Sequence, residues 1–135
     1  MESKNKKIIL VVDDDHEFVA ALATFLKGHG FEVLKAYDAT LAVKFARKEP
    51  VGLMTLDLGL PAGGGQFVLR SVRKFESTAQ LPIIVSTANV EEGILEASLA
   101  LGASDFIAKP YDLETLLEKI KALLNPPSVE PPVIS

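Results

Sequence analysis

The side chains with the clearest chemical potential are aspartates that end apolar runs. Three consecutive aspartates, Asp13 to Asp15, follow the apolar run 8–12, and Asp57 ends the run 51–57. If both runs are strands of one parallel sheet, their carboxyl ends meet at one edge of that sheet. Two carboxylates about 5 Å apart at an effective dielectric of about 20 repel by roughly 3 kcal/mol, so we expect a cation between them. Hard cations such as Mg²⁺ bind oxygen ligands and often a phosphate as well.

Two other polar side chains stand at the ends of apolar runs. Thr87 ends the fourth run, and Lys109 follows the fifth. The carboxylates of Asp13, Asp14 and Asp57 carry three negative charges. Lys109 adds one positive charge, so one divalent cation would neutralise the set. A metal ion, an amine and a hydroxyl around one carboxylate suit phosphoryl transfer, with Asp57 as the nucleophile.

The same residues also have a purely structural interpretation. Acidic residues at a helix N-terminus interact favourably with the helix dipole, and this accounts for Asp15. It does not account for Asp57 reaching the same edge. A single threonine or lysine at a strand end is commonly structural too, but four strand ends with complementary chemistry favour a functional site.

Apolar runs and helical patterns alternate five times along the chain. The predicted strands are Ile8–Val12, Phe31–Tyr37, Val51–Asp57, Leu81–Thr87 and Asp105–Ala108. The predicted helices run from Asp15 to Lys27, from Asp38 to about Lys48, from after the glycines 63–65 through Phe67 to Arg73, from an Asn89 cap to near Gly102, and from an Asp112 cap to Leu124. Strict alternation predicts a parallel sheet with right-handed crossovers and helices on both faces.

The second strand sets the expected strand order. Glu32 and Lys35 interrupt it, and charged residues suit an edge strand better than a central one. This favours the order 2-1-3-4-5, an α/β doubly wound five-stranded parallel sheet in a flavodoxin-like three-layer sandwich. Ligands then bind beyond the carboxyl ends of the strands where the winding reverses, between the first and third strands.

Composition narrows the possible functions. A length of 135 residues favours one domain, and the absence of Cys excludes disulfides, thiolate zinc sites and cysteine nucleophiles. The polar start, Met1 to Lys7, precedes an apolar run too short for a signal peptide or a membrane span, so we expect a cytoplasmic protein without membrane insertion. Net charge is −4 with Lys and Arg scattered along the sequence, so direct nucleic-acid binding is not expected. We expect a domain over 1–124 and a Pro-rich tail or start of a linker over 125–135.

The chain resembles the receiver (CheY-like) domains of bacterial two-component response regulators over about residues 6–124. The resemblance rests on four segments in this order and spacing: Val12-Asp13-Asp14-Asp15, Asp57-Leu58-Gly59-Leu60-Pro61 with Gly65 after it, Thr87-Ala88, and Lys109-Pro110. It implies a phosphorelay switch, not an enzyme with a separate substrate. The phosphoryl donor would be a sensor histidine kinase or a histidine phosphotransfer protein, and Asp57 would accept the group.

The resemblance also implies roles for individual residues. Asp13, Asp14, Asp57 and the Gly59 carbonyl would hold Mg²⁺ (or Mn²⁺). Thr87 and Lys109 would bind phosphoryl oxygens, and Lys109–Pro110 would be a cis peptide. Phe106 would be an aromatic switch that moves inward when Thr87 shifts toward the phosphate. The output face would comprise the fourth helix, fifth strand and fifth helix, acting on an unidentified effector or in a phosphorylation-dependent homodimer.

Some positions depart from the usual pattern of that family. Phe106 lacks the hydroxyl that tyrosine brings in some members, and Gly64 replaces an acidic or amide residue. The three successive glycines predict a mobile loop after Asp57, because ordering glycine costs much entropy. Leu95 and Leu99 are candidates for an exposed apolar patch on the output face, although a wide buried stripe would explain them equally well.

Two other functions fit parts of the sequence. A receiver-like docking module that works without phosphorylation would be marked by loss of the acidic pair, Asp57, Thr87 or Lys109, all of which are present. A haloacid dehalogenase-like phosphatase would share the Asp-x-Asp start at Asp13. It would need Thr or Val where Glu17 stands, and a cap segment that this chain lacks.

Overall fold

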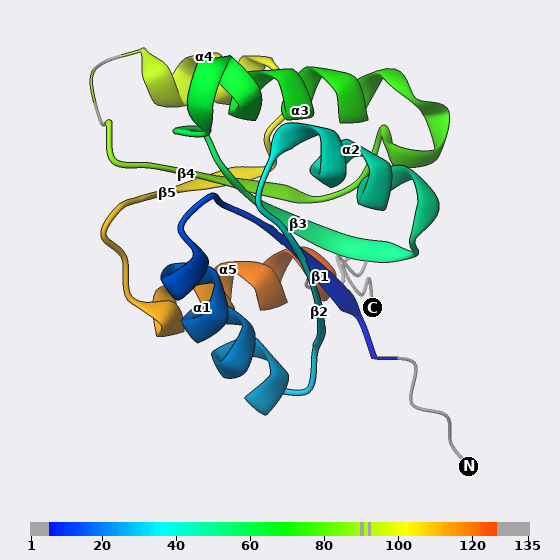
Figure 1. The fold of residues 1–135 in the computed structure, drawn as a ribbon, viewed down its shortest axis with the longest axis vertical. Coiled ribbons are helices and arrows are strands. Elements are labelled where there is room, and N and C mark those ends of the chain that lie inside the picture. The colour runs from blue at the N-terminus through cyan, green and yellow to red at the C-terminus, as the bar shows by residue number, and fades with distance from the viewer. Residues whose placement is uncertain (1–5, 90, 92, 127–135) are drawn as a thin grey trace, which may run out of the picture.

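The computed structural model describes residues 6–89, 91 and 93–126, and these residues form five strands that alternate with five α-helices (Figure 1). The elements are β1 (Ile8–Val12), α1 (His16–Gly28), β2 (Glu32–Ala36), α2 (Ala39–Lys48), β3 (Val51–Asp57), α3 (Gly64–Lys74), β4 (Ile83–Thr87), α4 (Ile94–Ala100), β5 (Asp105–Ala108) and α5 (Leu113–Leu124). Two short 3₁₀ turns, η1 (Pro61–Gly63) and η2 (Glu76–Thr78), flank α3.

The strands form one parallel sheet in the order β2-β1-β3-β4-β5, which confirms the predicted fold. The charged strand β2 lies at one edge, as expected from its sequence. In the centre, β1 and β3 pair so that Val12 lies opposite Leu56, one residue before Asp57. The aspartates after β1 and at the end of β3 therefore reach the same edge of the sheet.

Helices cover both faces of the sheet, which gives three layers (Figure 1). On one face, α2, α3 and α4 pack over Leu10, Met54 and other side chains that point to that face. On the other face, α1 and α5 pack over Ile9, Leu53 and their neighbours. Alternate residues of β1 thus enter different cores, which is why its apolar run is unbroken. None of the described helices has the length and apolar character that crossing a membrane requires.

Aspartate side chains cap three of the helices. Asp15 accepts the Phe18 N–H at 3.1 Å, Asp38 accepts the Leu41 N–H at 2.8 Å, and Asp112 accepts the Thr115 N–H at 3.2 Å. Such caps satisfy backbone donors that have no partner within the helix. The predicted helix starts are therefore correct for α1, α2 and α5.

The predicted start of α4 is wrong. The helix begins at Ile94 after Gly93, not after Asn89. Asn89 instead accepts the Glu91 N–H at 3.0 Å in a local turn, and Gly93 has a positive φ of 95°, which interrupts a right-handed helix. Strand ends differ less: β4 begins at Ile83, after Pro82, and β2 is shorter than predicted at both ends.

The two leucines of α4 differ in exposure. Leu99 is 43% exposed, whereas Leu95 is half-buried. Ser98 is buried and donates a hydrogen bond to the Leu95 carbonyl. Of the two candidates for an apolar patch, only Leu99 is exposed, whereas Leu95 fits the alternative of a wide buried stripe.

Candidate functional site

Three aspartates meet at the carboxyl edge of β1 and β3. One carboxylate oxygen from each of Asp13, Asp14 and Asp57 lies within 4.8 Å of the other two. Asp13 and Asp57 are buried, while Asp14 is exposed to solvent. Oxygen ligands from carboxylates, with one side open to water, suit a hard divalent cation such as Mg²⁺.

The Asp57 carboxylate is held from two sides. Its Oδ1 accepts the Gly59 N–H at 2.8 Å, and its Oδ2 lies 3.6 Å from the Lys109 ammonium. Burial raises the pKa of Asp57, and the charges of Asp13 and Asp14 add to this, while Gly59 and Lys109 act in the opposite direction. The net result is a raised pKa. A bound cation would favour the ionised form instead.

Lys109 joins the two buried aspartates. Its Nζ donates to Asp13 Oδ2 at 2.8 Å and lies near Asp57 on the same side of the site. Burial alone lowers the pKa of Lys109, but the hydrogen bond to Asp13 and the charges of Asp57 and Asp13 together outweigh it and raise the pKa. The ammonium is therefore positively charged at neutral pH. The Lys109–Pro110 peptide bond that follows β5 is cis.

The Thr87 hydroxyl is engaged by the loop after β4. Thr87 is buried, and its Oγ1 accepts the Asn89 N–H at 2.9 Å and donates to the Asn89 carbonyl at 3.3 Å. Phe106, on the adjacent strand β5, is half-buried and packs against the core under α2, α3 and α4. The structure therefore places Thr87 at the expected edge, with its hydroxyl bonded to the loop.

Two glycines let the backbone approach Asp57 closely. A Cβ at Gly59 would lie 3.2 Å from Asp57 Oδ1. A Cβ at Gly65 would lie 2.6 Å from Leu58 Cα and 2.7 Å from the Asp57 carbonyl oxygen, closer than real Cβ atoms come. Gly65 therefore lets the start of α3 pack directly on the end of β3. The Gly59 carbonyl as a metal ligand remains a prediction.

Sequence reasoning missed an aromatic border beside the acidic residues. A hollow of about 470 Å³ is lined by Asp15, Phe18, Ala88, Lys109, Pro110 and Tyr111. The rings of Phe18 and Tyr111 meet edge to face, 5.7 Å between centroids. Burial raises the pKa of Tyr111, and the negative charges of Asp13 and Asp57 raise it further. From the sequence, Phe18 is indistinguishable from the other residues of the apolar stripe of α1. Tyr111 follows Lys109-Pro110 directly, so its place beside the site could have been predicted.

Comparison with known proteins supports the family assignment. A family model described as the response regulator receiver domain matches residues 9–121. Regulatory protein VanRc of Enterococcus gallinarum is 35% identical over 117 residues, which cover 87% of this chain and 49% of the relative. Transcriptional regulatory protein GltR of Pseudomonas aeruginosa is 37% identical over 123 residues, which cover 91% and 51%. The chain spans about half the length of these two relatives.

Solved structures show the same architecture. A CheY-like response regulator receiver domain protein from Methanospirillum hungatei superposes with a TM-score of 0.83 at 30% identity, covering 90% of this chain and 95% of that one. The receiver domain of a sensor histidine kinase from Pseudomonas aeruginosa gives a TM-score of 0.80 at 28% identity, covering 88% and 98%, and holds a magnesium ion in its active site cleft. Since the family match spans most of the chain and the fold agrees throughout, this protein belongs to the response regulator receiver domains of two-component systems.

Proposed function

We propose that this chain is a phosphoacceptor switch in which Asp57 takes a phosphoryl group in a reaction that needs Mg²⁺ or Mn²⁺. One observation carries the proposal: Asp13, Asp14 and Asp57 meet at one edge, and Lys109 lies 2.8 Å from Asp13 and 3.6 Å from Asp57. Receiver domains are phosphorylated by histidine kinases or phosphotransfer proteins, so we propose a phosphohistidine on such a protein as the donor.

The reaction is a simple transfer between two side chains. A carboxylate oxygen of Asp57 attacks the phosphorus, the P–N bond to the donor imidazole breaks, and the imidazole leaves with the electron pair of that bond. A metal ion held by Asp13, Asp14, Asp57 and the Gly59 carbonyl would neutralise charge on the phosphoryl oxygens. Lys109 stabilises the same oxygens with its ammonium group, which its raised pKa keeps protonated.

Switching follows from the position of Thr87. To donate to a phosphoryl oxygen, its hydroxyl must give up the hydrogen bond that it donates to the Asn89 carbonyl, and this would let the loop between β4 and α4 move. Space vacated near β4 would let Phe106 turn inward from its half-buried position. We propose that α4, β5 and α5 form the output face, read by an effector or by a second copy in a phosphorylation-dependent homodimer.

The proposed domain occupies residues 1–124, and residues 125–135 form a Pro-rich tail or the start of a linker. We also propose that the protein is cytoplasmic.

The first experiment measures the intact mass of the protein after incubation with acetyl phosphate, with and without Mg²⁺, for wild type and for Asp57→Asn. We expect a single phosphoryl adduct that needs both Mg²⁺ and Asp57. Beryllofluoride binding checks for an adduct too short-lived to detect. Folded protein with neither adduct nor beryllofluoride binding would favour a docking module that works without phosphorylation.

A further inference from the structure

The helices α2 and α3 together carry many basic residues and no acidic residue. Their basic residues are Lys44, Arg47 and Lys48 on α2, and Arg70, Arg73 and Lys74 on α3. Six of the 14 Lys and Arg residues thus lie on two helices, although the chain has a net charge of −4. The basic residues only look scattered along the sequence, because folding brings the two segments side by side (Figure 1).

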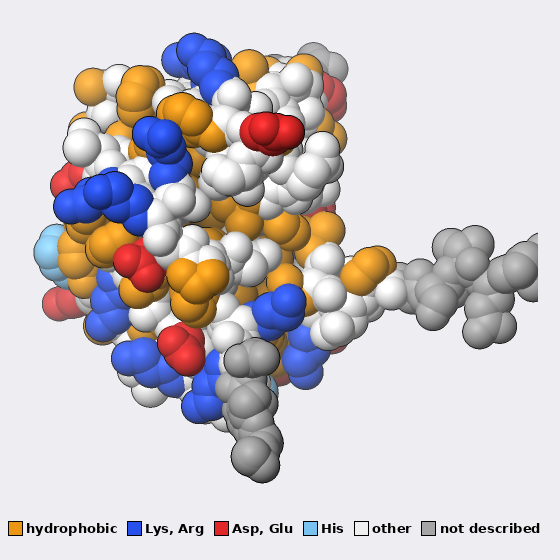
Figure 2. All heavy atoms as spheres, turned by 90° about the vertical axis from the view of Figure 1, so that its right-hand side faces the viewer, with side chains coloured by type: hydrophobic (Ala, Val, Ile, Leu, Met, Phe, Trp, Pro, Cys, Tyr) orange, Lys and Arg blue, Asp and Glu red, His pale blue; other side chains and the backbone are white. Residues whose placement is uncertain are grey.

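Five of these residues face solvent. The sixth, Arg73, is turned inward, where its guanidinium donates to the Gly102 carbonyl at 2.9 Å and to the Thr78 carbonyl at 3.0 Å. We call the other five the α2–α3 basic face: Lys44, Arg47, Lys48, Arg70 and Lys74, all exposed. Figure 2 shows Lys and Arg side chains at its upper left, where α2 and α3 lie, and others across its lower half. Within the described ranges, the ion pairs involve Lys109 and Lys119 and none of these five.

The basic face includes a hollow suited to an anionic group. Its volume is about 390 Å³, and its lining residues are Thr40, Val43, Lys44, Arg47, Lys48 and Ser77. Three cations and two hydroxyls therefore surround it, without a carboxylate. The Arg47 guanidinium lies 3.8 Å above the centre of the Phe75 ring, and this contact favours the observed side-chain position before any ligand binds.

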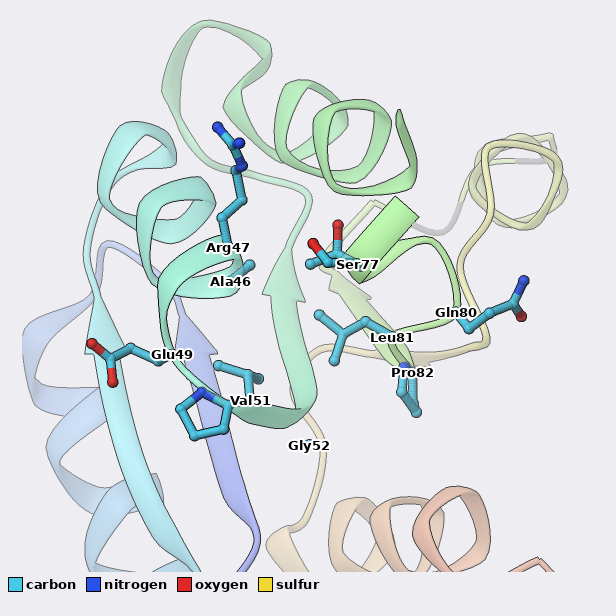
Figure 3. Close-up of a pocket in the computed structure, with 11 residues that line it drawn as sticks. Ala46, Arg47, Glu49, Val51, Gly52, Ser77, Gln80, Leu81 and Pro82 are labelled. Atoms are coloured by element: carbon cyan, nitrogen blue, oxygen red, sulfur yellow. The ribbon is translucent and has the colours of Figure 1, made fainter. Parts of the chain in front are cut away.

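A second hollow adjoins the first but has different chemistry. It measures about 320 Å³ and shares Arg47 and Ser77 with the first. In Figure 3, the Arg47 side chain rises toward the end of α3, while Glu49 and Gln80 point away from the hollow. Its wall is otherwise formed largely by apolar side chains and backbone, such as Val51 and Leu81, so we assign the anionic contact to the first hollow alone.

We propose that the α2–α3 basic face docks an acidic segment of a partner protein, with one carboxylate in the hollow between Lys44 and Arg47. Phe67 supports a protein partner, because this side chain is 50% exposed on α3, one turn before Arg70. A segment with both acidic and apolar side chains would cover it. The surface lies apart from the carboxyl edge that holds Asp57, so the inference does not depend on phosphorylation.

Charge around the patch favours a short acidic segment over a nucleic acid. Glu49 and Glu76 stand just beyond the ends of α2 and α3 and limit the patch. All 18 acidic residues of the chain lie outside the two helices. A nucleic acid is charged along its whole length, so its phosphates would meet the carboxylates of Glu49 and Glu76 at the ends of the patch.

The test measures binding of a fluorescein-labelled twelve-residue peptide of alternating Glu and Leu, by anisotropy at low salt. The patch variant neutralises four residues: Lys44→Gln, Lys48→Gln, Arg70→Gln and Lys74→Gln. The control variant makes the same change in net charge at other exposed positions: Lys6→Gln, Lys7→Gln, Lys27→Gln and Lys121→Gln. We expect the Kd to rise about 10- to 100-fold in the patch variant only, the combined factor for four exposed ion pairs.

Two further measurements make the result decisive. Phe67→Ala should weaken the Glu-Leu peptide but not a Glu-Ser peptide of the same length, and amide shifts of labelled wild type should change on α2 and α3. Equal weakening in both four-residue variants, no binding by wild type, or shifts on other faces would overturn the proposal. Tighter binding of a random-sequence duplex DNA than of the peptide would assign the surface to nucleic acid instead.

Discussion

Asp57 and Lys109 experience opposing influences at the centre of the site. Burial and two neighbouring aspartates disfavour the ionised form of Asp57, whereas the ammonium 3.6 Å away favours it. Without a metal, the folded protein therefore keeps an unfavourable concentration of negative charge. That cost is the reason we propose a cation at this site, and it should be visible in the stability of the protein.

The pH dependence of stability tests whether ionised Asp57 destabilises the folded protein. Its pKa is raised in the folded protein, mainly by burial, so between the unfolded and folded values the folded state binds more protons. Its contribution to stability therefore falls as pH rises through the folded pKa, and stays low at neutral pH. Asp57→Asn should be more stable than wild type at pH 7 in EDTA, and the difference should shrink toward pH 4.

Urea denaturation at several pH values measures this difference. Asp38→Asn is the matched control, because Asp38 is exposed and asparagine caps a helix as well as aspartate. Adding Mg²⁺ should stabilise wild type and reverse the order at neutral pH, since a ligand that binds only the folded state raises its stability. If Asp57→Asn is less stable than wild type in EDTA at pH 7, the electrostatic account is wrong.

At the scale of helices and strands, the sequence predicted those positions that depend on a local pattern of residues. Apolar runs located the five strands, although Glu32 and Lys35 interrupt the second, and aspartate caps located three helix starts. The start of α4 could not be found this way, because Asn89 suits a local turn as well as a cap and Gly93 has a positive φ. The contacts of Thr87 with Asn89 were also out of reach, because they depend on the path of that loop.

The sequence singled out the three glycines after β3, but it did not show why glycine is needed there. We took three successive glycines to predict mobility, and this remains a prediction. The structure corrects the expected loop in part, because Gly64 and Gly65 lie in the first turn of α3, where they are buried and Gly65 lies against the backbone at the end of β3. Close packing is a property of two elements together, so no pattern within one element reveals it.

Substitution of Gly65 should disturb the junction of β3 and α3. In Gly65→Ala the new Cβ would meet backbone atoms at 2.6 and 2.7 Å, so the backbone must shift. We expect a loss of about 1–3 kcal/mol in unfolding free energy, with slower phosphorylation of Asp57. Gly28→Ala, with nothing within 4 Å, should be neutral or stabilising by up to about 1 kcal/mol. Thermal or urea unfolding measures both, and equal stabilities of the two variants would refute the packing argument.

At the scale of the whole molecule, charge is unevenly distributed. The carboxyl edge of the sheet gathers acidic residues, whereas α2 and α3 gather basic ones. Composition could not reveal this, because the net charge of −4 is a sum over both regions. We therefore propose different partners for the two surfaces: a metal ion and a phosphodonor at the first, and an acidic segment at the second.

Activation should change the structure on one side of the molecule and leave the other side largely unchanged. Beryllofluoride with Mg²⁺ should shift backbone amide resonances at residues 87–89, α4 and β5, because the Thr87 hydroxyl must stop donating to the Asn89 carbonyl in order to donate to the bound group. Amides of α2, on the far side of α3 from α4, should change least. Two-dimensional NMR of labelled protein measures this. Shifts that stay within a few residues of Asp57 would contradict an output face at α4 and β5.

The inward-turned guanidinium of Arg73 has a mechanical consequence for that response. It bonds the Gly102 carbonyl, just beyond the C-terminal end of α4, and so fastens this end to α3. The opposite end of α4 joins the loop that starts at Thr87. We therefore expect a displacement that begins in this loop to rotate α4 about its C-terminal end near Gly102. Because this hydrogen bond holds the C-terminal end of α4, we expect activation to move the N-terminal end near Ile94 farther than the end near Gly102.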